Sequence, residues 1–328
     1  MTPETTTPER AAAPRPSLEL LDHLVEEVET VFHGKREVVR LALAALLAHG
    51  HILFEDVPGV GKTTLAHALA KALGVGFRRI QFTSDLLPSD VLGVSIYNPK
   101  SAECETRPGP IVSNVVLADE INRAPPRTQS GLLEAMQEGR VTIDDHTYDL
   151  PRPFMVMATQ NPLEHHGTYP LPESQLDRFL MRLTIGYPDR VAERRILTES
   201  ASTEPVFDRL RTVLNPDQVL RLQERVEEVE ADESIVDYLM TVVDRTRNSP
   251  KIRMGVSPRG AIALYRACRA LALTHGRTYL VPDDVRTLIV PCLAHRILPS
   301  GATSTSADTH EHAAALLEDL MDEVQAPV

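Results

Sequence analysis

Short apolar runs alternate with longer helical stretches through the first half of the chain. Five runs of four to seven residues are expected to be strands: 51–54, 77–82, 115–118, 154–158 and 179–185. Apolar runs of this length, separated by helical segments, are typical of a parallel sheet covered on both faces. Two helices are predicted before the first strand, at 17–30 and 36–49. The pattern therefore predicts a doubly wound α/β core around a parallel five-stranded sheet.

After residue 188 the pattern becomes helical. Six helices are expected, at 190–200, 216–229, 233–248, 258–275, 282–297 and 308–324. Pro216, Pro258 and Pro282 begin three of them, where proline is tolerated because the first helical turn needs no N–H from it. We therefore expect a core at 17–188 and a helical lid domain at 189–328, after a disordered Thr-, Pro- and Ala-rich tail at 1–16.

Two segments interrupt the core pattern. Residues 84–114 hold several Pro, Gly and Ser and are expected to be irregular. Residues 140–150 predict a short β-hairpin, with Asp144 and Asp145 near its turn. The turn of this hairpin is acidic.

Bulk properties limit the function classes. The chain has 328 residues and is 42% apolar, enough for two compact units with a core. It has no run of about 18 apolar residues, so no membrane span is expected. The net charge of −12 argues against a nucleic-acid binder, which gains affinity by placing Lys and Arg on phosphates.

Cysteine and histidine positions give no metal-ligand pattern. Cys104, Cys268 and Cys292 lie far apart, which predicts neither a zinc site nor a disulfide framework and makes the cytoplasm the default localisation. The histidines at 165–166 and at 310 and 312 lack a third ligand at a suitable spacing. We interpret them as polar loop residues.

Residues 56–64 carry the clearest chemistry. They follow a predicted strand and open a helix, the context in which a glycine-rich loop binds phosphate. Lys62 is expected to reach the β- and γ-phosphates of ATP, and the Thr63 hydroxyl to bind Mg²⁺. Asp56 stands where such a loop usually has its first glycine. The expected nucleotide contacts are Pro58, Gly59, Val60, Gly61, Lys62, Thr63 and Thr64.

Polar residues follow two of the other predicted strands. Asp119 and Glu120 come after the run 115–118, at the strand end where ligands bind in open α/β sheets. Asp119 is expected to hold Mg²⁺ through water, and Glu120 to orient the attacking water or accept its proton. Asn161 follows the run 154–158 and could position the same water, although an Asn before a Pro is also a common turn.

Two arginines lie outside these loops. Arg178 precedes the last core strand, where its guanidinium could complete a neighbouring subunit's site or, alternatively, pair with Asp177 or Glu173. Arg259 begins a helix of the second domain and could reach the γ-phosphate from there.

These five segments, in this order, resemble the AAA+ ATPases over roughly residues 18–297. In that family they look like Walker A, Walker B, sensor 1, the arginine finger and sensor 2. The strings at 79–90, 119–126 and 167–179 are similar to the MoxR branch. The resemblance implies that Val31 and Phe32 lie near the adenine. It also implies that 84–114 and 140–150 are insertions that line the pore of a ring, a hexamer.

MoxR-like proteins are chaperone-like ATPases that mature or assemble partner complexes, often proteins with von Willebrand factor A domains and sometimes with insertion of a metal cofactor. For this chain that role is implied by the resemblance alone. Two alternatives remain: a nucleic-acid translocase, which the acidic hairpin disfavours, and the motor subunit of a metal chelatase, which has a similar core.

Overall fold

The computed structural model describes residues 18–100, 103–144, 146–161, 167–199, 206–301 and 306–327. The predicted tail, Asp145 and the histidines at 165–166 lie outside these ranges.

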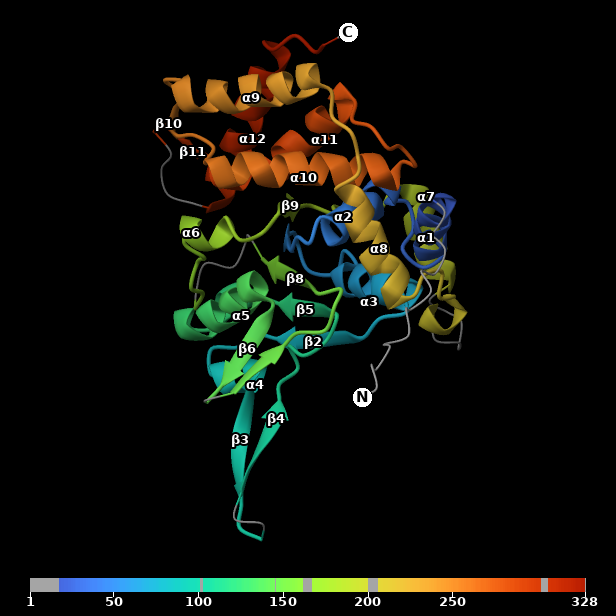
Figure 1. Cartoon of the computed structure of the whole chain (residues 1–328), viewed down its shortest axis with the longest axis vertical. Helices are drawn as coiled ribbons and strands as arrows, with labels where there is room; N and C mark the ends of the chain where they lie inside the picture. The colour runs from blue at the N-terminus through green and yellow to red at the C-terminus, as the bar shows by residue number, and fades with distance from the viewer. Residues whose placement is uncertain are drawn as a thin grey trace, which may run out of the picture.

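A parallel five-stranded sheet forms the centre of the molecule, with the spatial order β2-β5-β8-β1-β9 (Figure 1). The predicted doubly wound α/β core is therefore confirmed, and each strand lies within its predicted run or within two residues of it. The strands are β1 (Ile52–Glu55), β2 (Phe77–Gln81), β5 (Val115–Asp119), β8 (Met155–Gln160) and β9 (Met181–Leu183).

Alternate residues of each strand face opposite layers, as the two-residue period of a strand requires. Leu117 and Met157 pack with α1 (Glu19–Glu29), α2 (Arg36–Leu47) and α3 (Lys62–Ala72). Val116 and Val156 pack with α5 (Pro126–Glu138) on the other side. Because Leu117 is fully buried, its truncation to alanine should cost about 2–5 kcal/mol of stability. Both faces being covered explains why the strands are continuously apolar.

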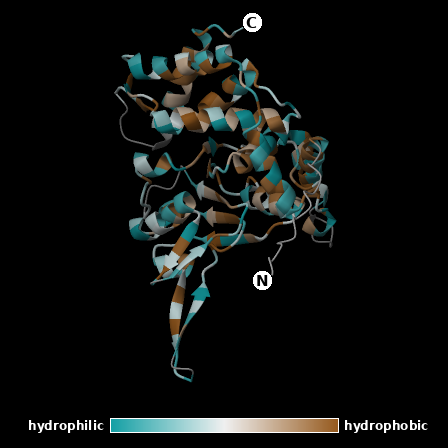
Figure 2. Cartoon of the chain, viewed as in Figure 1, coloured by the Kyte–Doolittle hydropathy of each residue, from teal (hydrophilic) through white to brown (hydrophobic). Residues whose placement is uncertain are grey.

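Two hairpins leave the core layer. The expectation that 84–114 is irregular is wrong, because this stretch forms α4 (Pro88–Leu92) and the paired strands β3 (Gly93–Asn98) and β4 (Glu103–Pro108). This hairpin projects away from the body, and apolar positions remain exposed along β3 (Figures 1 and 2). The second hairpin pairs β6 (Arg140–Ile143) with β7 (His146–Asp149), as predicted.

The second half contains the six predicted helices: α7 (Arg190–Glu199), α8 (Pro216–Val226), α9 (Glu233–Asn248), α10 (Pro258–Thr274), α11 (Pro282–Leu293) and α12 (Ser306–Asp322). Their predicted bounds are accurate to within four residues. Ser257 begins α10 by accepting a hydrogen bond from Gly260 N at 3.1 Å.

The sequence pattern missed two short strands in this half, β10 (Ile252–Met254) and β11 (Leu298–Pro299). In the core it missed the short helix α6 (Glu173–Leu176). Within the described ranges, no helix combines the length and the apolar character needed to cross a membrane.

Candidate functional site

The loop between β1 and α3 has the backbone of an anion cradle. Gly59 and Gly61 have φ values of +87° and +97°, a conformation that residues with a Cβ rarely adopt. A Cβ on Gly61 would lie 3.0 Å from Cε2 of Phe32, so space is also restricted there. The loop leads directly into the first turn of α3, where unpaired N–H groups and the helix dipole favour a phosphate.

Lys62 connects this loop to the acidic end of β5. Its Nζ donates a hydrogen bond of 2.6 Å to the carbonyl oxygen of Asp56. Burial lowers the pKa of Lys62, while the nearby carboxylates of Asp56, Asp119 and Glu120 act in the opposite direction. A bound phosphate would offer Lys62 oxygen acceptors in place of this backbone carbonyl.

Asp119 lies at the end of β5 with both carboxylate oxygens engaged. Its Oδ1 accepts a hydrogen bond of 2.6 Å from the hydroxyl of Thr159, at the end of the adjacent strand β8. Its Oδ2 accepts hydrogen bonds of 3.1 and 2.5 Å from Arg79 of β2. Asp119 and Thr63, on the first turn of α3, offer hard oxygen ligands, the donor type that Mg²⁺ requires.

Glu120 follows Asp119 in the left-handed region, with a φ of +58°. This conformation aims its N–H at Thr159 Oγ1, over 2.8 Å. The Glu120 carboxylate accepts a hydrogen bond of 2.7 Å from Gln81 and lies 3.2 Å from Nε of Arg123. Thr159 therefore fixes the relative positions of Asp119 and Glu120.

The other predicted contacts lie around the same loop. Thr63 and Thr64 are half-buried on the first turn of α3. Asn161 is half-buried immediately after β8, between the loop and β5 in the sheet order. Val31 and Phe32 are buried, and Phe32 touches the loop at Gly61.

Arg178 and Arg259 lie together at the opposite end of the sheet, where its parallel strands begin. Arg178 precedes β9 and donates a hydrogen bond of 2.7 Å to the carbonyl oxygen of Leu133, not to an acid. Arg259 is exposed, and its Nε lies 3.8 Å from Oδ2 of Asp177. The phosphate loop follows the other end of β1, a strand of four residues, so the two ends of the sheet are roughly 15 Å apart. Both arginines therefore lie away from the phosphate loop of their own chain in this conformation.

Two protein-family models match the chain. Residues 51–181 match the ATPase family associated with various cellular activities (AAA), and residues 244–319 match the AAA lid domain. The chain is 52% identical to the uncharacterized protein YeaC of Bacillus subtilis, over 94% of this chain and 95% of that one. It is 43% identical to the chaperone MoxR1 of Mycobacterium tuberculosis, over 85% of this chain and 75% of the relative.

This chain belongs to the MoxR family of AAA+ ATPases. A crystal structure of a Cytophaga hutchinsonii protein described as an ATPase has the same fold, with a TM-score of 0.84 and 35% identity. That match covers 95% of the MoxR-family chain described here and 96% of the other.

Four residues of this MoxR-family site were not predicted to act there: Arg79, Gln81, Thr159 and Asp56. The first two alternate on β2, so they share one face, but nothing in the sequence shows that β2 lies beside β5. Thr159 lies next to the predicted run 154–158, and nothing in that run marks it as a partner of Asp119. Asp56 was recognised as a departure from the usual glycine, without a role.

Proposed function

We propose that this protein binds Mg-ATP at the loop 56–64 and hydrolyses it. The observation that carries the proposal is the convergence of Lys62, Asp119 and Glu120 at one edge of the sheet. Lys62 would bind the β- and γ-phosphates, with the N–H groups from Pro58 to Thr64 around them. Thr63 and Asp119 would hold Mg²⁺, which when bound offsets the charge of the phosphates.

Two residues would act on the attacking water. Glu120 would accept its proton. It directly follows Asp119, the proposed magnesium ligand, and Thr159 bonds to both residues. Asn161, at the end of β8, would orient the same water through its side-chain amide. We further propose that residues 17–188 form the nucleotide-binding unit and residues 189–328 the lid.

We also propose that copies assemble head to tail into a ring, a hexamer by family resemblance. Arg178 and Arg259 lie at the edge where the strands begin, and the phosphate loop lies where they end. A heterologous interface that repeats around a closed ring would bring these two edges together. Each chain would then lend both arginines to the neighbour's γ-phosphate, where they would stabilise the charge of the transition state.

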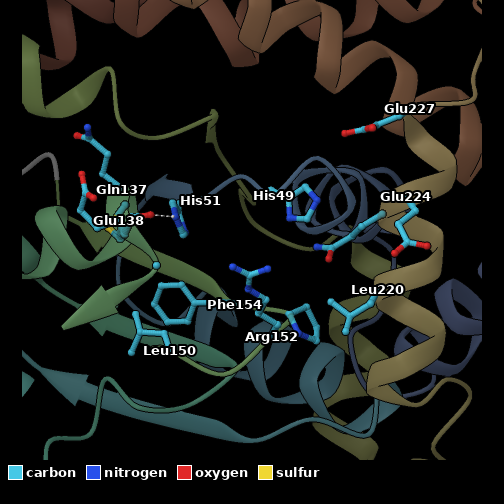
Figure 3. Close-up of a pocket in the computed structure, with 14 residues that line it drawn as sticks. His49, His51, Gln137, Glu138, Leu150, Arg152, Phe154, Leu220, Glu224 and Glu227 are labelled. Carbon is cyan, nitrogen blue, oxygen red and sulfur yellow. Dashed lines mark hydrogen bonds between the residues drawn. The ribbon is translucent and has the colours of Figure 1, made fainter. Parts of the chain in front are cut away.

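The surface around these arginines is hollowed and suits an interface. A cavity of about 250 Å³ is lined by Arg178, Arg259 and Arg266, among others. A second cavity, of about 580 Å³, shares His49 and His51 with the first and is drawn in Figure 3. Exposed Arg152 and Arg266 line these cavities without an ion pair to any residue of the described ranges. Unpaired cations are available to anionic groups of a neighbour.

The test of this proposal mixes two inactive proteins. Lys62→Ala chains should bind ATP weakly and hydrolyse little of it, and Arg178→Ala chains should lack the donated arginine. Mixed rings contain interfaces that pair an intact loop with an intact Arg178, so part of the ATPase rate should return. Arg253→Ala alters an exposed arginine outside both cavities and is the control. No recovery in rings proven to be mixed would contradict donation between chains.

We propose that the client is a protein, handled in the chaperone-like manner that the name of the MoxR1 relative indicates. The family resemblance suggests a von Willebrand factor A domain, whose metal-ion site attracts carboxylates. Exposed Asp144, at the turn between β6 and β7, is our candidate contact. Insertion of a cofactor into that partner would be one outcome of such maturation.

Measuring the ATPase rate with DNA, RNA and candidate partner proteins tests the choice of client. Stimulation by a protein is expected, because an acidic loop repels phosphates. A response to nucleic acid alone, at physiological salt, would favour a translocase instead. A response only to a porphyrin-binding partner would favour a chelatase motor.

A further inference from the structure

Asp56 is a buried carboxylate at the first position of the phosphate loop, with only 6% of its surface exposed. Its Oδ2 accepts hydrogen bonds from Ile185 N at 2.6 Å and Gly186 N at 2.9 Å. Its Oδ1 accepts one from Val57 N at 3.1 Å. Hydrogen bonds to an ionised acceptor are stronger than those between neutral groups. The side chain therefore fastens the chain beyond β9 to the phosphate loop, which a glycine could not do.

The segment held in this way leads into α7. Asp189 caps that helix, with Oδ1 accepting hydrogen bonds from Val191 N at 2.9 Å and Ala192 N at 2.8 Å. The first turn of α7 packs closely on the loop before α2, since a Cβ on Gly34 would lie 3.0 Å from Cβ of Ala192. His33 bonds to Glu199 at the other end of α7, over 3.1 Å.

The chain of contacts that begins at Asp56 returns to the phosphate loop at Gly61. The segment from Gly34 leads back to Phe32, whose ring touches the loop at Gly61. Residues 31–34 and 185–192 thus form one wall, which meets the loop at Gly61 through Phe32 and at Asp56 through Gly186. We call it the β9-side wall.

The position of this wall relative to a nucleotide follows from the sheet order β5-β8-β1-β9. Asp119 and Glu120 lie beyond β8 on one side of the loop, which assigns the γ-phosphate to that side. The wall lies beyond β1 on the other side. A nucleotide with its phosphates in the loop therefore extends its sugar and base towards the wall.

We propose that Asp56 is a positioning residue that holds the β9-side wall against the phosphate loop and so determines how tightly the nucleoside part of ATP is bound. This inference rests on the proposed function. It separates two parts of the site: Lys62 and the loop N–H groups hold the phosphates, while Asp56 acts through the wall on the base.

The experiment compares binding of ATP with binding of inorganic tripolyphosphate, both with Mg²⁺, by calorimetry. Tripolyphosphate probes only the phosphate cradle. In the natural protein ATP should bind more tightly than tripolyphosphate. The ratio of the two dissociation constants measures the contribution of the nucleoside. Asp56→Gly removes the three charge-assisted hydrogen bonds, and we expect ATP to bind about tenfold more weakly. Tripolyphosphate affinity should change by no more than about twofold, which corresponds to about 0.4 kcal/mol of binding free energy. The phosphate cradle itself is left intact.

A second variant reaches the wall without touching the loop. Asp189→Ala loosens the first turn of α7 and should cause the same ATP-selective loss, which a change in the loop itself would not explain. Asp232→Ala removes an equivalent cap from α9 and should leave both affinities unchanged.

An equal loss of ATP and tripolyphosphate affinity in Asp56→Gly would overturn the inference, because Asp56 would then act through the cradle. Unchanged ATP affinity in both Asp56→Gly and Asp189→Ala would overturn it as well. Both outcomes leave the proposed function standing, since the natural protein still binds. A natural protein that binds neither probe would overturn the proposed function and this inference together.

Discussion

The side-chain amide of Gln81 donates a hydrogen bond of 2.7 Å to Oε2 of Glu120. The two residues come from neighbouring parallel strands, because Gln81 lies directly opposite Asp119 in the pairing of β2 with β5. Arg123 approaches the same oxygen to within 3.2 Å. The carboxylate that we propose as the base is thus engaged by two donors in this conformation. Each donor occupies a lone pair of Oε2, and an occupied lone pair cannot accept a proton from water.

Gln81→Ala should raise the basal ATPase rate several-fold. Losing a hydrogen bond to a charged group is worth about 1.5–3 kcal/mol at most, and less at this exposed position. The steady-state rate at saturating ATP is the measurement. Gln175→Ala, which alters an amide remote from Glu120, is the control. A rate that falls instead would mean that Gln81 orients Glu120 for the reaction and does not restrain it.

Lys62 and Glu120 should separate binding from turnover. Glu120→Gln keeps the shape of the side chain and removes its basicity, so ATP affinity should persist while the rate falls by about 10²–10⁴. Lys62→Ala removes a charge-assisted hydrogen bond to phosphate and should weaken binding by about 10–100-fold. Nucleotide titration beside steady-state hydrolysis distinguishes the two. Normal turnover in Glu120→Gln would reject its assignment as the base.

Local patterns in the sequence were enough to predict the sheet, the helices and the phosphate loop. The buried runs at 115–118 and 154–158 are continuously apolar because helices cover both faces of the sheet, and that signal is contained in each run. The proline-led starts of α8, α10 and α11 are equally local. Each of these features follows from the residues of its own segment.

The unpredicted features depend on contacts between distant segments. Gln81 meets Glu120, and Arg79 meets Asp119, only because β2 and β5 are adjacent in the sheet. Arg259 and Asp177 are 82 residues apart in sequence. They lie side by side because α10 packs near the beginning of β9. The β3–β4 hairpin was missed because its exposed strands lack the apolar runs that marked the core.

Cys104 should be the reactive thiol of the native protein. It is exposed on β4, opposite Tyr97, whereas Cys268 and Cys292 are buried. Burial raises the pKa of Cys292 to about 12 and that of Cys268 well above its usual value, so neither thiolate forms near neutral pH. Mass spectrometry after maleimide treatment should therefore find one label per folded chain and three after unfolding.

The same thiol reports on the projecting hairpin. If the hairpins converge in a ring, a short bismaleimide should join Cys104 of neighbouring chains when ATP is present, and Cys104→Ser should abolish the product. ATP-dependent rings without this cross-link would place the hairpins apart from one another.

His51 should make stability depend on pH. Its buried ring donates a hydrogen bond from Nε2 to Met136 O (Figure 3) and accepts one from Val156 N at Nδ1. Both bonds are 3.0 Å long, and only the neutral ring can make both. Burial lowers its pKa from 6.5 to about 4. Between those values the unfolded chain binds a proton that the folded chain does not.

The free energy of unfolding should therefore fall as the pH drops from 6.5 towards 4, by up to about 1.4 kcal/mol per pH unit from this residue, and His51 should contribute no slope above 6.5. Urea titrations at pH 7, 6 and 5 measure the slope. In His51→Gln the amide can accept from Val156 and donate to Met136 without titrating, so its slope should be smaller than that of the natural protein. Equal slopes in the two proteins would mean that other groups, such as half-buried His310 with its pKa lowered to about 3, carry the acid sensitivity.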